Sequence, residues 1–169
     1  MIPVNQTISN SKNGDCVRAC VASLLECNIE FIPNFMGNSN EGYAQAVKKW
    51  GDKLGIIVLD IATDNVDIFQ GIHVMAFGKS PNFEDCQHAV IYCDGELSHD
   101  PSPSKKGLLG DPLGYTVFMI KNYSIVRNLI KASIEYELSE LWFYDEISPG
   151  LNENQVKFLK KRNEEKRDE

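Results

Sequence analysis

The sequence predicts an α+β fold in which an N-terminal helix packs on an antiparallel sheet. The chain has 169 residues, a length that a single hydrophobic core can organise. A helical pattern of apolar residues begins at Cys16, and short β-branched or aromatic runs follow between residues 56 and 120. Two of these runs flank Asp94-Gly95, which is the strongest short-range signal of an antiparallel hairpin.

Two helices are expected before the strands. The first follows the turn-forming Asn13-Gly14-Asp15, and its run CVRACVASLLE places apolar side chains along one side. Cys16 therefore falls in the first turn, where backbone N–H groups have no intrahelical partner and the helix dipole favours an anion. A second helix is predicted from about Glu41 to Leu54, with an apolar side that includes Trp50.

The strand-like segments are short and bounded by Gly, Pro, Asp or Asn. They are IIVLDIA from Ile56, HVMAFG from His73, HAVIYC from His88, ELSHD from Glu96 and GYTVFMI from Gly114. Because the Asp94-Gly95 turn joins HAVIYC to ELSHD, we expect His88 and Asp100 on neighbouring antiparallel strands. The segment PSPSKKGLLGDPLG is rich in Pro, Gly and Ser and is interpreted as a surface loop.

The pattern changes after Asn122. We expect residues 1–122 to form the main domain and residues 123–169 to form a helical extension packed on it. The run IVRNLIKASIEYELSELW has helical spacing, whereas a final polar helix from about Asn152 should fray because RNEEKRDE has nothing to bury.

Composition and charge argue against several classes of protein. A formal net charge of -7 and a pI of about 5.0 oppose binding to nucleic acid. No stretch approaches the roughly 20 apolar residues that cross a bilayer, and the N-terminus MIPVNQTISNSKNGD lacks the features of a signal peptide. The chain has no glycine-rich phosphate loop or dinucleotide fingerprint. We therefore expect a cytoplasmic protein without a nucleotide cofactor, a nucleic-acid ligand or a membrane partner.

Cys16 is the candidate nucleophile. Cysteine thiols are expected to stay reduced in the cytoplasm, and the five cysteines of the chain cannot all pair within one molecule. A thiol attacks as its thiolate, which a helix N-terminus and a cationic neighbour both favour. Position gives Cys16 the first of these, whereas Cys20, Cys27 and Cys93 are interpreted as core residues.

His88 and Asp100 are the candidate partners of that nucleophile. A cysteine–histidine pair needs a base near the thiol and a group on the other ring nitrogen that fixes the tautomer. His88 begins one strand of the predicted hairpin and Asp100 follows the other, which suits a base and its orienting carboxylate. His73 and His99 rank below His88, because His73 begins another strand and His99 points away from Asp100 if the strand persists.

These motifs resemble those of papain-like cysteine peptidases. An upstream Gln, the segment GDCVRACVASLL and the segment HAVIYCDGELSHDP are most similar to the double-glycine leader peptidase domains of bacteriocin exporters and to related stand-alone proteins of bacteria and phages. The resemblance covers roughly Gln6 to Ile120 and implies a papain-like catalytic domain. It also implies a peptide or protein substrate. Unlike the exporter-fused peptidases, this sequence has no membrane part.

The resemblance also implies a role for each site residue. Cys16 would be the nucleophile, His88 the base, Asp100 its orienting residue and Gln6 the amide donor of the oxyanion hole. In the family the glutamine lies closer to the cysteine, at the place where this chain has Asn10. We favour Gln6 over Asn10 and expect the Cys16 backbone N–H to be the second donor.

Other readings of the same residues remain open. Cys16, Cys20, Cys86 and His88 could in principle bind zinc, but structural zinc ligands usually come in closely spaced pairs from irregular chain. We therefore expect no metal. The same triad also suits deamidation or transamidation of glutamine, and a protein without activity could bind a partner in the same cleft.

Overall fold

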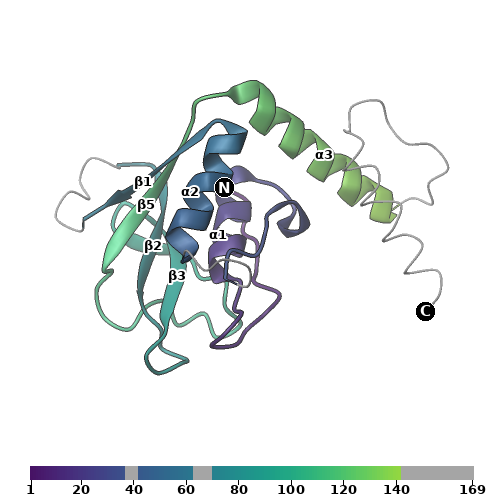
Figure 1. The fold of residues 1–169 in the computed structure, drawn as a ribbon. Helices are drawn as coiled ribbons and strands as arrows, with labels where there is room; N and C mark the ends of the chain where they lie inside the picture. Colours follow the sequence, from purple (N-terminus) through teal and green to yellow (C-terminus); the bar gives the residue numbers. More distant parts are fainter. Residues whose placement is uncertain (37–41, 63–69, 142–169) are drawn as a thin grey trace.

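A computed structural model describes residues 1–36, 42–62 and 70–141. Figure 1 shows two helices, α1 (Cys16–Leu25) and α2 (Tyr43–Leu54), on one side of a twisted sheet. A third helix, α3 (Tyr123–Leu141), leaves the edge of this layer, and a short 3-10 helix, η1 (Ile29–Phe31), follows α1. This arrangement confirms the α+β class and the antiparallel sheet.

The described strands form one antiparallel sheet in the order β1-β5-β2-β3-β4. Their bounds agree with the segments expected from the sequence: β1 (Ile56–Ile61), β2 (His73–Lys79), β3 (Gln87–Cys93), β4 (Glu96–His99) and β5 (Gly114–Ile120). The β3–β4 hairpin turns at Asp94 and Gly95, whose φ angles are 53° and 80°. Two consecutive residues with positive φ form the turn type that matches the twist of a two-residue hairpin.

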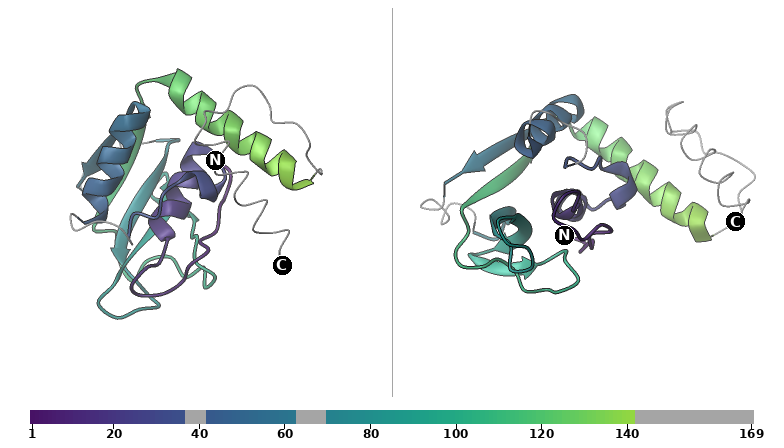
Figure 2. Two further views of the ribbon diagram at one scale, coloured as in Figure 1. Left: turned by 45° about the vertical axis from the view of Figure 1, so that its right-hand side comes forward. Right: turned by 60° about the horizontal axis from the view of Figure 1, so that its bottom comes forward.

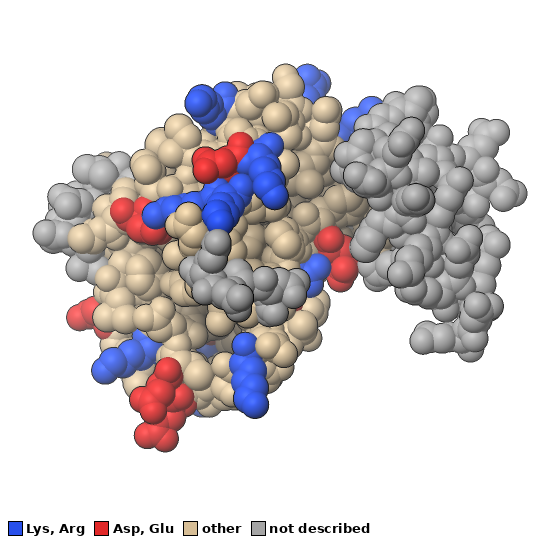
Figure 3. Space-filling model, viewed as in Figure 1, with Lys and Arg blue, Asp and Glu red and all other residues tan. Residues whose placement is uncertain are grey.

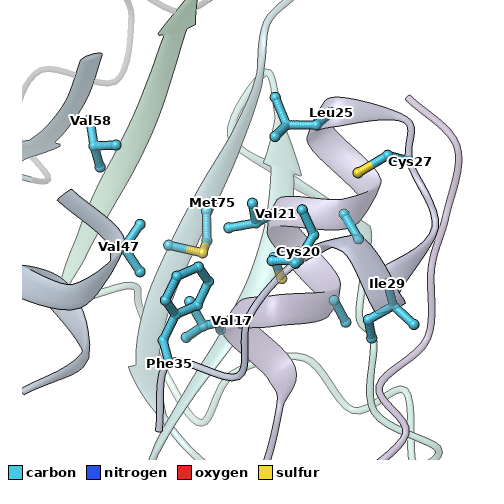
Figure 4. Close-up of a cluster of buried hydrophobic side chains, with 14 of the residues drawn as sticks. Val17, Cys20, Val21, Leu25, Cys27, Ile29, Phe35, Val47, Val58 and Met75 are labelled. Atoms are coloured by element: carbon cyan, nitrogen blue, oxygen red, sulfur yellow. The ribbon is translucent and has the colours of Figure 1, made fainter. Parts of the chain in front are cut away.

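α1 packs against the centre of the sheet. Its Val17, Cys20 and Val21 are buried in the same cluster as Met75 of β2. Figure 4 shows Met75 between Val21 of α1 and Val47 of α2, so side chains from both helices and the sheet meet in one core. Burial of apolar surface of this kind is the main force that fixes α1 on the sheet.

α2 begins later than the sequence indicated. It starts at Tyr43 after Gly42, which has a φ of 77°, and the expected start at Glu41 lies outside the described residues. The helix ends at Gly55, whose left-handed conformation (φ 68°) is the common end of a helix. Val47 and Gly51 are its buried residues, and Gly51 lets β1 approach closely because a Cβ there would meet Val58 at 2.8 Å.

The segment after β4 is the irregular, mostly exposed loop that its composition predicted, but a few of its residues are buried against the sheet. Pro101 and Ser102 are buried, and Leu108 packs on the outer face of the sheet against a cluster around Val90 and Tyr115. Proline and glycine mark irregular backbone but do not determine whether that backbone is covered. This loop therefore closes the second face of the sheet and lies beside Asp100.

α3 crosses near the C-terminal end of α1 (Figure 2). Its Val126 is buried in the α1 core, and Ser133 Oγ accepts a hydrogen bond from the backbone N–H of Asn28. Phe31 and Tyr136 meet edge to face with ring centroids 5.6 Å apart. The helix expected after Asn122 is thus present, whereas the final polar helix predicted from about Asn152 lies outside the described residues.

Charged side chains on one face of the molecule are mixed in sign. Figure 3 shows Lys, Arg, Asp and Glu close together on the visible face, with wide uncharged areas between the groups. Lys48 and Asp60, for example, form an ion pair at 2.8 Å. In the part of the chain that the structure describes, no helix is both long and apolar enough to cross a membrane.

Candidate active site

Cys16 is the first residue of α1 and is partly exposed. The first intrahelical hydrogen bond of this helix runs from the Ala19 N–H to the Asp15 carbonyl at 2.9 Å. Within the described residues, the side chain of Asp15 makes no capping hydrogen bond to the first turn. The backbone N–H groups of Cys16 and Val17, next to the thiol, therefore have no partner within the helix, and they would stabilise an anion there.

His88 and Asp100 form a buried hydrogen-bonded pair. His88 Nε2 and Asp100 Oδ1 are 2.8 Å apart, and the two residues are 6% and 3% exposed. Cys16 lies beside His88, since it is one of the groups that raise the pKa of His88 and both residues line one pocket. Because Nε2 contacts the carboxylate, Nδ1 is the ring nitrogen left for the thiol. The structure therefore brings the three residues predicted from the sequence into one continuous chain.

A β-bulge explains why Asp100 faces His88. In the β3–β4 ladder Tyr92 lies opposite Leu97, but Ile91 lies opposite His99, so one extra residue, Ser98, is accommodated on β4. Extending that register places Asp100, one residue beyond β4, opposite Val90. Residues 88 and 90 share one face of β3, whereas an unbulged ladder would place Asp100 opposite residue 89 and on the other face.

The electrostatics of the pair favour a charged imidazole. Burial by itself would lower the pKa of His88, but the hydrogen bond with Asp100 and the interaction with the neighbouring Cys16 outweigh it and raise the pKa from 6.5 to about 9. His88 thus carries a proton at neutral pH. An imidazolium beside the Cys16 sulfur is the cationic neighbour that a nucleophilic thiol requires.

Asp100 is held as a carboxylate by several donors. Burial opposes its charge, but hydrogen bonds from His88 and from the backbone N–H groups of Ser102 (2.7 Å) and Gly107 (2.8 Å) lower its pKa from 3.8 to about 2. Gly107 has a φ of 71°, a conformation that glycine adopts without strain. The buried residues of the loop after β4 therefore fix the carboxylate as well as covering it.

An open pocket of about 310 Å³ lies at the Cys16–His88 pair. One wall is the N-terminal segment between residues 6 and 14, and another is the β2–β3 loop, which contains Phe83 and Asp85. The Cys86 sulfur lies 3.8 Å from the Ser11 carbonyl oxygen, so the two walls touch there. A pocket of this size accepts a few side chains of an extended chain or one small molecule.

Gln6 and Asn10 both line this pocket, but their side chains differ in exposure and in hydrogen bonding. The Asn10 side chain is exposed, and its oxygen accepts hydrogen bonds from the N–H groups of Lys12 (3.0 Å) and Asn13 (2.7 Å) in the loop. Gln6 is partly buried, and its amide nitrogen donates one hydrogen to the Ile8 carbonyl at 3.1 Å. The other amide hydrogen of Gln6 is available to a ligand, which favours Gln6 as the oxyanion donor.

The remaining histidines serve other contacts. His99 Nε2 donates to the Val4 carbonyl at 2.9 Å, and His73 lies opposite Cys93 at the end of the β2–β3 pair that is farthest from the β2–β3 loop. Cys20 and Cys27 are buried in the core, as expected, but Cys93 is only half-buried beside the hairpin turn, where the strand leaves the core. Among the described residues, no group of three or more His, Cys, Asp or Glu side chains is arranged to bind a metal.

The sequence did not reveal the role of Asp15. An Asp before a helix is a typical N-cap, yet here its carboxylate is fully buried and bonds to Thr7 and Ile8. The sequence around Asp15 does not indicate that its carboxylate bonds to Thr7 and Ile8 instead of capping the helix. These two residues lie in an irregular segment whose position is determined only by the tertiary fold.

Comparisons with protein-family models, with curated proteins and with solved structures found no match to this chain.

Proposed function

We propose that the chain is a papain-like cysteine hydrolase that cleaves an amide bond, in a peptide or isopeptide link, through a thioester intermediate. The observation that carries this proposal is the continuous contact from Cys16 through His88 to the buried carboxylate of Asp100, beside an open pocket. A cysteine at a helix N-terminus, a histidine on a strand and an orienting carboxylate are the parts that such a mechanism needs.

The arrangement of the elements supports the papain-like assignment. A nucleophile helix packs on an antiparallel sheet whose strands carry the histidine and lead to the aspartate. The sequence motifs around Cys16 and His88 resemble the double-glycine peptidase type, and we extend the proposal to that kind of stand-alone bacterial or phage protein.

The first half of the reaction would acylate Cys16. Its thiolate attacks the carbonyl carbon, and the resulting oxyanion accepts hydrogen bonds from the Cys16 backbone N–H and the Gln6 amide. His88 Nδ1–H then gives its proton to the nitrogen of the leaving amine as the C–N bond breaks. Asp100 keeps the ring in line through Nε2 and stabilises the imidazolium.

The second half would release the acyl group. Neutral His88 takes a proton from water, and the hydroxide that forms attacks the thioester carbonyl. The C–S bond breaks, the acid product leaves, and the Cys16 thiolate–His88 imidazolium pair is restored. These steps use only residues of this chain and water.

The cysteines support a reducing location. None of the five, all in the described part of the chain, forms a disulfide, and a nucleophilic thiol must stay reduced to act. We therefore place the protein in the cytoplasm, with a protein or peptide as its substrate.

The proposal can be tested with two small probes. Wild-type protein should give a burst of p-nitrophenol from p-nitrophenyl acetate and should be alkylated quickly by iodoacetamide at a single cysteine. Cys16→Ser should lose both reactions. Cys86→Ser is the matched control, because Cys86 lines the same pocket without the His88–Asp100 pair, and this variant should keep both. Slow, unselective alkylation of the wild-type protein would contradict the proposal.

Incubation with a cell lysate separates the possible products of an active thiol. New peptide termini found by mass spectrometry would identify a peptidase, whereas deamidated or cross-linked glutamines would identify a deamidase or transamidase that uses the same triad. A wild-type protein that shows neither product nor a burst would be a binding protein that uses the same cleft.

A further inference from the structure

Asp15 is a buried carboxylate whose hydrogen bonds lead away from its own helix. It is 0% exposed, and it precedes the nucleophile directly. Its oxygens accept from the Thr7 N–H (3.0 Å), the Thr7 hydroxyl (2.7 Å) and the Ile8 N–H (2.8 Å). Arg18 lies 3.8 Å away and partly balances the charge. Such a carboxylate is costly to bury unless its partners are fixed.

The contacts of Asp15 continue to the Gln6 amide through one backbone unit. The Asp15 N–H donates to the Ile8 carbonyl at 3.1 Å, and the same carbonyl accepts the Gln6 side-chain amide at 3.1 Å. The Ile8 N–H in turn donates to the Asp15 carboxylate. Ile8 is therefore held at both polar atoms by Asp15, and it holds the side chain of Gln6.

The Gln6 side chain has a polar atom that these contacts do not satisfy. Its Oε1 is buried and has no hydrogen-bond partner among the described residues. An unpaired buried oxygen costs free energy that a purely structural glutamine would avoid. The orientation is instead set by the bond from Nε2 to Ile8, which leaves the second Nε2 hydrogen for a ligand.

Asp15 also leaves the start of α1 open. A carboxylate at this position usually accepts from the N–H groups of the first turn, and this one, within the described chain, does not. Because its oxygens are occupied by Thr7 and Ile8, the N–H groups beside Cys16 remain available for a developing oxyanion.

We propose that Asp15 is a positioning residue of the oxyanion hole: its carboxylate fixes the Thr7–Ile8 backbone that orients the Gln6 amide, and it leaves the first-turn N–H groups of α1 uncapped. This inference rests on the proposed hydrolase function. It assigns to Asp15 a part in transition-state stabilisation and none in activating the thiol.

The test compares a reaction that develops an oxyanion with one that does not. Acylation by p-nitrophenyl acetate passes through a tetrahedral oxyanion, whereas alkylation by iodoacetamide does not. Asp15→Asn should slow acylation roughly tenfold to a hundredfold, as expected for a misplaced catalytic group. It should leave alkylation of Cys16 as fast or faster, because a negative charge next to the thiolate is removed.

A double-mutant cycle identifies the route through Gln6. In a Gln6→Ala background, Asp15→Asn should slow acylation by less than about threefold, because residues that act as a unit are not additive. Thr7→Val removes the hydroxyl bond to Asp15 at an exposed residue and should give a smaller loss of acylation alone. It keeps the test valid if Asp15→Asn fails to fold.

Two outcomes would overturn the inference while the proposed function stands. One is that Asp15→Asn and Thr7→Val slow acylation and alkylation in equal proportion, and the other is that their effects multiply with that of Gln6→Ala. A wild-type protein that shows neither the burst nor fast alkylation would overturn the proposed function and this inference together.

Discussion

The two sides of the candidate site are held in different ways. His88 and Asp100 belong to a hairpin, where the backbone ladder, a bulge and the loop after β4 determine their positions. Gln6 belongs to a segment without regular structure, and side-chain contacts from Ser23, His99 and Asp15 hold that segment in place. Proton transfer would thus depend on local secondary structure, and oxyanion binding on tertiary contacts.

The largest expected effect comes from a substitution in the hairpin, at His88. His88→Ala removes the base that takes the thiol proton and the cation beside Cys16, so acylation by p-nitrophenyl acetate should fall roughly a thousandfold to ten-thousandfold. Alkylation by iodoacetamide at neutral pH should also slow, because the thiolate loses its neighbour. Stopped-flow and mass-spectrometric rates measure the two. If His88→Ala alkylates as fast as wild type, the imidazole does not activate the thiol.

A substitution in the N-terminal segment, at Gln6, should slow acylation but not alkylation. Gln6→Ala removes an oxyanion donor and should slow acylation about a hundredfold to a thousandfold, while alkylation stays nearly unchanged. Asn10→Ala is the matched control, because Asn10 lines the same pocket but bonds within its own loop, and its effect should be small. A large loss in Asn10→Ala with a small loss in Gln6→Ala would exchange their assigned roles.

The hairpin pair should also make stability depend on pH. The folded-state pKa of His88, about 9, exceeds its ordinary value of 6.5, so its stabilisation is complete below about pH 6.5 and is lost as the pH rises through 9. Asp100, lowered from 3.8 to about 2, contributes above pH 3.8 and loses its contribution as the pH falls through 2. We expect the free energy of unfolding to drop on the order of 1 to 3 kcal/mol between pH 6 and 9.5.

Urea unfolding of wild type and His88→Gln at both pH values measures this contribution. The difference in unfolding free energy between the two proteins should shrink at the higher pH. A difference that is the same at pH 6 and 9.5 would show that the protonated imidazole does not stabilise the fold.

The smallest expected effect concerns the loop that holds Asp100. Gly107→Ala and Gly110→Ala both place a side chain at positive φ (71° and 81°), which costs about 1 to 2 kcal/mol of stability. A Cβ at 107 would also meet Leu97 at 3.0 Å, whereas one at 110 meets nothing within 4 Å. The melting temperature should therefore fall in both variants, and further in Gly107→Ala. Acylation should slow only in Gly107→Ala, because the backbone there must shift and its N–H holds the Asp100 carboxylate. Equal acylation rates in the two variants would show that the Gly107 N–H does not position Asp100 for the reaction.

The same difference between the hairpin and the N-terminal segment explains which parts of the site could be predicted from the sequence. Short β-branched or aromatic runs predicted the strands, and Asp94-Gly95 predicted the hairpin that brings His88 and Asp100 together. The bulge at Ser98 was not predicted, because it arises from how two strands and the covering loop settle against each other. The choice between Gln6 and Asn10, and the contacts of Asp15, depend on segments distant in sequence and have no local pattern.

The N-terminal segment has a consequence for when the site becomes complete during folding. His99 bonds to Val4, 95 residues away in sequence, and Lys105 bonds to Asn5, 100 residues away. Contacts of such separation close a long loop and tend to form late, after local hairpins and helices. In refolding followed by hydrogen exchange, protection at Thr7 and Ile8 should lag behind protection at Val90. A chain still being synthesised would then hold an activated thiol but no oxyanion hole, so it could not acylate itself or its neighbours before its fold is finished.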